Sequence, residues 1–579
     1  MTARHDLVIR GGTLADGLGG EPIVADVAVD GDVITVVGTV GDAGREEIDA
    51  RGLLVTPGFV DIHTHYDGQA TWDSRLAPSS WHGVTTAVMG NCGVGFAPVR
   101  PDAHGRLISL MEGVEDIPGA VLDEGIDWRW ESFGDYLNAV ERRPHDIDVC
   151  AQLPHGALRL YVMGERAARL EDATEEDAAA MRRIATEAMT AGAIGFSTSR
   201  TLNHRTATGD PTPSLRARVE ELEAIALGVA DAGHGVIELI SDFWPDPDAE
   251  FAMIRRLVEV SGRPLSLSLA QNNRQPEAWR DLLAMIEAAV ADGLPIRAQV
   301  APRPVGLLLG LQSSFNPFSG HPSWREVAGR PLEEQVRMVR DPAFRARLLG
   351  EGALPQGDRA DGNGGARRRL VDYTRLFPLG EVPDYEPSPE TSIARMAASR
   401  GVDPDELALD LLCADGGRGF LFAPFSNYAD GNLDACGVMM SHPDTVLGLG
   451  DGGAHVGIIA DASFPTYALA HWCRDRSHDR KPLGWMVAQL TSGPAGAVGL
   501  LDRGVVAAGM KADLNVLDTE RLRCEAPIMA YDLPAGGKRL LQRARGYCAT
   551  VVSGQVTYRE GEPTDALPGR LVRGDRPAP

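Results

Sequence analysis

The chain has 579 residues, a length that predicts several domains or one large α/β barrel with additions. Hydrophobic residues make up 44% and charged residues 24%, which excludes fibrous and wholly disordered proteins. The net charge of −25 would repel phosphate backbones and anionic lipid, so we expect neither a nucleic-acid nor a membrane partner.

Cysteine usage and the absence of apolar runs indicate the compartment. The seven cysteines are odd in number, scattered and never in a C-x-x-C pair, which argues against a disulfide framework or a structural zinc site. No apolar run approaches the roughly 18 residues that span a bilayer, and the first residues lack a signal-peptide pattern. We therefore expect a cytoplasmic protein.

The two ends of the chain share one sequence pattern. Residues 7–10, 24–29 and 33–37 are short β-rich runs separated by Gly and Asp turns, and residues 512–518 and 549–558 repeat the pattern. This similarity predicts one small, discontinuous β-sandwich built from residues 1–56 and 501–579.

Between the ends, apolar β-rich runs alternate with segments of helical period, which is typical of a parallel α/β fold. Eight strands are predicted, at residues 59–62, 85–89, 147–152, 193–197, 235–240, 265–269, 296–300 and 445–449. Helices are predicted at residues 174–191, where Thr174 and Asp177 form a capping box, and at 214–232. The economical arrangement is a (β/α)8 TIM-like barrel over residues 57–500.

About 145 residues separate the seventh and eighth strands, so the barrel must carry an insertion, which we place at about residues 303–435. Its Gly-rich and Arg-rich stretch at 350–369 predicts a mobile loop. A long insertion at the mouth of a barrel is usually a lid or a specificity element. The alternative is that the insertion is a surface excursion or a dimer contact. The sequence leaves open whether the protein forms a homo-oligomer.

The segment Pro57 to His65 is the sharpest local motif, because an apolar strand there ends in His63-Thr64-His65. Side chains two apart on a strand point the same way, so both imidazoles can share one metal ion at the strand's carboxyl end. The alternative is an ordinary polar strand end.

The eighth strand ends in a carboxylate flanked by glycines, at Gly450-Asp451-Gly452. Asp451 would there bind the same metal through one oxygen and take a proton from metal-activated water. An Asp-Gly turn without chemistry is the alternative.

These motifs, together with Gly90-Asn91-Cys92-Gly93 and the closing segment 509–514, resemble the amidohydrolase superfamily, in particular its N-acyl-D-amino-acid deacylase (D-aminoacylase) branch. The resemblance covers nearly the whole chain. It implies a metal-dependent barrel with a small β-sandwich, and hydrolysis of a small-molecule amide with one tight zinc and sometimes a second metal. It also assigns Cys92 as a metal ligand beside His63, His65 and Asp451.

The sequence departs from the family where the fifth and sixth strands should each supply a histidine. Those places read Glu238 to Phe243 and Ser266 to Gln271. A carboxylated lysine cannot replace them, because no lysine occurs in the first 480 residues. We therefore expect one Zn²⁺, or another divalent metal, per chain. Asp242 is a candidate replacement ligand or substrate contact.

Five further residues are candidate substrate contacts. The resemblance assigns His155 to the substrate or to the surroundings of the metal, and a structural hydrogen bond is the alternative. Arg200, together with Arg205, could clamp a carboxylate, or these could be solvated loop charges. His204 and His455 lie on loops that we expect near the mouth.

The sequence therefore predicts a hydrolase of carbon–nitrogen bonds other than peptide bonds, acting on an N-acyl (D-)amino acid or a similar small amide, with Asp451 as proton shuttle. Hydrolysis of a cyclic amide or imide, as by hydantoinase-like enzymes, is one alternative. A catalytically degenerate barrel that only binds a small ligand is the other.

Overall fold

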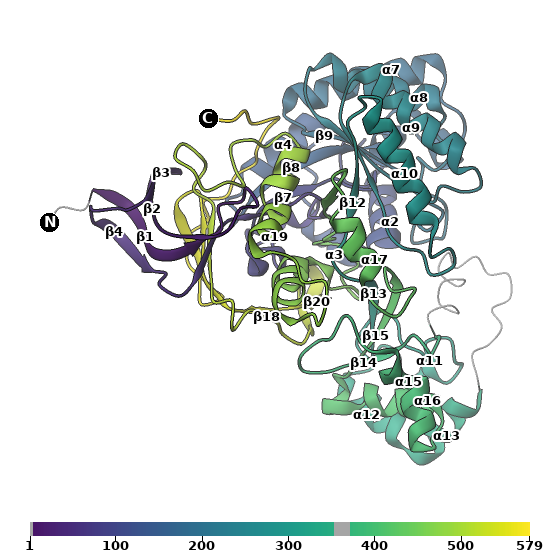
Figure 1. Ribbon diagram of the computed structural model, residues 1–579. Helices are drawn as coiled ribbons and strands as arrows, with labels where there is room; N and C mark the ends of the chain where they lie inside the picture. Colours follow the sequence, from purple (N-terminus) through teal and green to yellow (C-terminus); the bar gives the residue numbers. More distant parts are fainter. Residues whose placement is uncertain (1–3, 352–370) are drawn as a thin grey trace.

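The computed structural model describes residues 4–351 and 371–579, and eight parallel strands form its central sheet (Figure 1). In spatial order the strands are β6 (Phe59–Asp61), β7 (Val84–Met89), β8 (Asp148–Pro154), β9 (Gly195–Arg200), β10 (Val236–Ser241), β11 (Leu265–Ser268), β12 (Ile296–Val300) and β16 (Thr445–Leu447). Each overlaps one of the eight predicted segments, and the predicted (β/α)8 barrel is confirmed.

The two edge strands, β6 and β16, meet just beyond their carboxyl ends. Thr64 and Gly452 form a parallel bridge. The amide of His65 donates to the Gly452 carbonyl at 2.7 Å, and the amide of Asp451 donates to the His63 carbonyl at 2.9 Å. We call this contact, residues 63–65 against 451–452, the seam. It closes the barrel at the end where barrel enzymes carry their sites.

Helices cover the outside of the barrel. Their bounds are α2 (His104–Glu115), α4 (Phe133–Glu141), α5 (His155–Met163), α7 (Glu175–Ala191), α8 (Val219–Asp231), α9 (Pro247–Ser261), α10 (Ala278–Ala291), α17 (Asp434–Met440), α19 (Leu483–Leu490) and α20 (Ser492–Ala497). The predicted capping box of Thr174 and Asp177 begins α7. The prediction of a helix from residue 214 was wrong at its start, because Ser214 is in a turn and donates its hydroxyl to the Ser199 carbonyl.

Both ends of the chain build one nine-stranded sheet beside the barrel (Figure 1). Its strands are β1 (His5–Leu14), β2 (Ile23–Asp30), β3 (Val33–Gly38), β4 (Gly44–Asp49), β5 (Leu54–Pro57), β17 (Leu514–Leu517), β22 (Tyr547–Val552), β23 (Gln555–Arg559) and β24 (Glu562–Pro563). Strand β17 pairs with β5, and one apolar cluster joins Leu7 and Ile9 to Val516 and Val551. The two ends therefore share one core.

Between β12 and β16 the chain forms a separate lobe, seen below the barrel in Figure 1. Its sheet is β13 (Val305–Gly310), β15 (Phe420–Ser426) and β14 (Phe377–Leu379), and its helices are α11 (Trp324–Val327), α12 (Leu332–Arg340), α13 (Pro342–Glu351), α15 (Ile393–Arg400) and α16 (Pro404–Leu412). The predicted mobile loop at 350–369 lies almost wholly outside the described residues.

A hairpin from the C-terminal part, β19 (Ile528–Leu533) and β20 (Gly537–Leu541), reaches the loop after the seam. The amide of Leu540 there donates to the Val456 carbonyl at 2.6 Å. Within residues 4–351 and 371–579, no helix combines the length and apolar character needed to cross a lipid bilayer.

Candidate metal centre

The predicted histidine pair lies at the seam, directly after β6. The side chains of His63 and His65 are each 2% exposed, and their Nε2 atoms lie 3.5 and 3.6 Å from Oδ1 of Asp451. The seam hydrogen bonds fix the backbone of all three residues. On its other ring nitrogen, His63 contacts Oε1 of Gln299 at 2.8 Å, which leaves Nε2 free for a metal.

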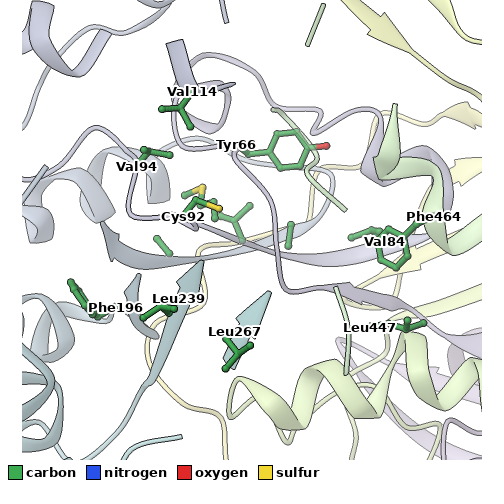
Figure 2. Packing of buried hydrophobic residues seen from close by; sticks show 14 of the residues in the cluster. Tyr66, Val84, Cys92, Val94, Val114, Phe196, Leu239, Leu267, Leu447 and Phe464 are labelled. Atoms are coloured by element: carbon green, nitrogen blue, oxygen red, sulfur yellow. The ribbon is translucent and has the colours of Figure 1, made fainter. Parts of the chain in front are cut away.

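Cys92 joins the histidines from the loop after β7. Its Sγ lies 3.3 Å from Nε2 of His63, and one ligand atom from each of His63, His65 and Cys92 falls within 4.8 Å of the others. Cys92 adopts a φ of 54°, and its amide donates to Oε2 of Glu238 at 2.9 Å. It belongs to the same buried cluster as Tyr66 and Val94 (Figure 2).

Asp451 is held in place by a tight loop. Its φ is 48°, in the left-handed region that side chains rarely adopt. A Cβ at Gly450 would collide with the Asp61 carboxylate, and a Cβ at Gly452 would collide with the Ser79 hydroxyl. The two glycines therefore let the loop lie directly against the strand-one side of the seam.

The donor set fits a divalent metal. Bonds of about 2.0–2.3 Å at tetrahedral angles separate neighbouring donors by about 3.3–3.6 Å. Three of the separations fall in this range: Sγ of Cys92 lies 3.3 Å from Nε2 of His63, and Oδ1 of Asp451 lies 3.5 and 3.6 Å from Nε2 of His63 and His65. Burial lowers the pKa of His65 to about 4, so its imidazole is neutral and can offer a lone pair.

The surroundings shift the pKa values of Asp451 and Cys92 in opposite directions. Although burial opposes it, the imidazoles of His65 and His63 hold the pKa of Asp451 well below its usual range. Burial, with Glu238 and Glu115 nearby, raises the pKa of the Cys92 thiol well above its usual range. A bound cation would counter this effect, because a coordinating thiol is deprotonated outright.

Two buried carboxyl groups, Glu115 and Glu238, lie beside the centre. The sequence motifs gave Glu115 no role and placed Glu238 only in the strand-five segment that lacks a histidine. Each is 1% exposed. Burial raises the pKa of Glu238 to about 7. A signal for Glu115 was present, because it lies four residues after Met111, on the face of α2 that the helical period assigns to the core.

Of the predicted substrate residues, the structure brings His204 and His455 to the centre. Burial, with His455 and His65 as neighbours, lowers the pKa of His204 to about 3, and its Nδ1 contacts Oγ of Ser199 at 2.9 Å. Nε2 of His455 lies 3.7 Å from Oε2 of Glu115, and its side chain is 27% exposed.

Four other predicted residues are engaged elsewhere in the fold. The ring nitrogens of His155 contact Thr198 and Glu221, so the structural hydrogen bond is what the structure shows. Glu250 binds Arg200 through both carboxylate oxygens, which neutralises this guanidinium. Asp242 is exposed and accepts from the Thr201 hydroxyl and the Leu202 amide, as a loop cap and not as a ligand. Arg205 donates to the carbonyls of Leu202 and Gly209.

The end of strand six also serves the fold. The side chain of Gln271 accepts from the Ala429 amide and donates to Asp430 at 2.7 Å, which ties the strand to the inserted lobe. This position therefore anchors the lobe where the family resemblance expected a histidine.

A (β/α)8 barrel with two histidines, a cysteine and an aspartate gathered at its mouth defines a class, the metal-dependent barrel hydrolases. The comparisons narrow this class. The family model described as "Amidohydrolase family" matches residues 46–558. The chain belongs to this family, whose members hydrolyse carbon–nitrogen bonds.

Three relatives show how far the likeness extends. The D-aminoacylase of Alcaligenes xylosoxydans xylosoxydans is 34% identical over 98% of this chain and 97% of its own length. A structure of N-acyl-D-glutamate deacylase from Bordetella bronchiseptica, with zinc and a phosphonate inhibitor, covers 98% of this chain and 99% of its own, with a TM-score of 0.64 and 21% identity. The L-hydantoinase of Arthrobacter aurescens covers 98% of this chain and 100% of its own, with a TM-score of 0.50 and 13% identity.

Proposed function

We propose that the chain hydrolyses the amide bond of an N-acyl-D-amino acid or a similar small amide, using one zinc ion held by His63, His65, Cys92 and Asp451. The observation that carries the proposal is the gathering of His63, His65 and Cys92 within 4.8 Å of one another, with Asp451 at 3.5 and 3.6 Å from the two imidazoles. When bound, zinc supplies a Lewis acid that polarises a carbonyl and lowers the pKa of water.

Asp451 is the residue that moves the proton. Its low pKa keeps it ionised, and Oδ1 faces the two imidazoles. The side chain is 18% exposed, so the carboxylate is also open toward the mouth. From this position it accepts a proton from the attacking water and delivers it to the leaving nitrogen.

The surroundings favour one metal and a small substrate. Gln271 is engaged by the inserted lobe, and Asp242 caps a loop. His204 and His455 are the side chains we assign to substrate contact, since both lie beside the centre and His455 is partly exposed. The D-amino-acid preference rests on the full-length likeness to D-aminoacylase. We expect the protein to act in the cytoplasm.

The test is a substrate comparison with the zinc-loaded full-length protein. We expect N-acetyl-D-methionine to be hydrolysed with a kcat/KM at least about tenfold above that of N-acetyl-L-methionine, and a hydantoin to be hydrolysed more slowly than either. Hydrolysis of the hydantoin alone would replace the proposed reaction with the cyclic-amide alternative. Zinc binding without hydrolysis of any of these amides would favour the alternative that the barrel only binds a small ligand.

A further inference from the structure

Glu115 lies at the last position of α2, beneath the metal centre, and its two oxygens face two different histidines. Oε1 is 3.3 Å from Nδ1 of His65, and Oε2 is 3.7 Å from Nε2 of His455. Among the described residues, neither Nδ1 of His65 nor Oε2 of Glu115 has a hydrogen-bond partner of good geometry. The burial of Oε2 is therefore not offset by a hydrogen bond within the described residues.

In both proposed metal-ligand histidines, the Nδ1 atom faces an oxygen of a neighbouring side chain. His63 directs its outer nitrogen, Nδ1, to Gln299 at 2.8 Å, and His65 directs the same atom to Glu115 at 3.3 Å. In metal sites an outer partner of this kind fixes the tautomer and the orientation of the ring. The contact of Glu115 with His455 adds a second link, from the metal ligand to the partly exposed mouth.

We propose that Glu115 is a positioning residue that holds the His65 ring with Nε2 toward the metal and connects this ligand to His455. The inference rests on the proposed function, because it requires His65 to bind a metal. It assigns to Glu115 no contact with the substrate and no bond to the metal.

The experiment measures zinc affinity of the full-length protein by competition with a chromophoric chelator. We expect Glu115→Ala to weaken zinc binding about 10–100-fold. Glu115→Gln should weaken it only about 3–10-fold, because an amide oxygen can accept from Nδ1 as Gln299 does at His63. Glu112→Gln is the matched control on the same helix. It is exposed, its contact is with the Gly119 amide, and its zinc affinity should equal that of the wild type.

Thermal unfolding of the metal-free proteins separates positioning from a structural role. Metal-free Glu115→Gln should unfold no earlier than the wild type, because a buried carboxyl without a strong partner stabilises little. A lower Tm with unchanged zinc affinity would overturn the inference. If Glu115→Ala does not fold, wild-type zinc affinity in Glu115→Gln also overturns it. A wild-type protein that binds no zinc would instead remove the proposed function.

Discussion

The Asp451 carboxylate faces two imidazoles through one oxygen while remaining partly open to the mouth. The same residue can therefore help hold a metal and accept a proton. Its strained φ of 48° is maintained by glycines on both sides, which pack against Asp61 and Ser79.

Replacing Asp451 by Asn removes the proton acceptor and keeps the side chain's shape. At saturating zinc, with His63, His65 and Cys92 still present, we expect kcat to fall about 10²–10⁴-fold. Steady-state kinetics with a zinc titration checks this. A kcat within about threefold of the wild type would mean that another group moves the proton.

At the residue scale, the sequence predicts those site residues that belong to a local motif. His63, His65 and Asp451 follow strands at fixed spacing, so their convergence follows from the barrel. Asp242 and Arg200 also lie at strand ends, but Thr201 and Glu250 bind them instead. Such competition between neighbours depends on side-chain packing, which one sequence does not display.

At the scale of elements, the eighth strand ends two residues earlier than predicted. Strand β16 stops at Leu447, because Leu449 adopts a φ of 59° and turns the chain toward the seam. The apolar content of the segment predicts the strand. Its end is not predictable from the sequence, because Leu449 adopts a left-handed backbone conformation although it is not a glycine. The same limit applies to Gln271, whose amide binds a lobe more than 150 residues further along the chain.

Glu386 ties the inserted lobe to the segment that follows the seam. Its carboxylate binds Nε2 of His471 at 2.6 Å and accepts from Nη2 and Nε of Arg476 at 2.9 and 3.0 Å. Although burial opposes it, these contacts lower the pKa of Glu386 to about 2. The stabilisation is therefore present above the unfolded pKa of about 4.5 and is lost as pH falls toward 2.

Glu386→Gln should remove this pH dependence. We expect the variant to be less stable than the wild type at pH 7 by about 1–2 kcal/mol, with the difference shrinking between pH 5 and pH 3. Urea unfolding at several pH values measures it. A constant difference across that range would show that Glu386 carries no such linkage.

At the scale of the whole molecule, a buried charge cluster joins the barrel to the C-terminal segment. Asp148, at the start of β8, contacts Arg503 at 2.8 Å and Lys511 at 3.3 Å. Arg503 also donates to the Thr86 hydroxyl on β7. Alternation of strands and helices predicted the barrel, and the β-rich runs at both ends of the chain predicted the second domain. The contacts of Asp148 join residues hundreds of positions apart, which no local pattern shows.

Asp148→Asn should destabilise the protein by about 3 kcal/mol, because it leaves two buried cations without this partner. Thermal unfolding provides the measurement. Asp231→Asn is the matched control, since it removes an exposed pair with Arg182 and should cost less than about 1 kcal/mol. An equal loss of stability in the two variants would contradict a role for the charge cluster in joining the barrel to the C-terminal segment.

The central claim is that one metal ion binds at the seam. Its most direct test is elemental analysis of the purified full-length protein and of the double variant His63→Asn, His65→Asn, with exposed His478→Asn as control. We predict about one zinc per chain in the wild type and the control, and none in the double variant. Metal retained at the wild-type level in the double variant would contradict the account.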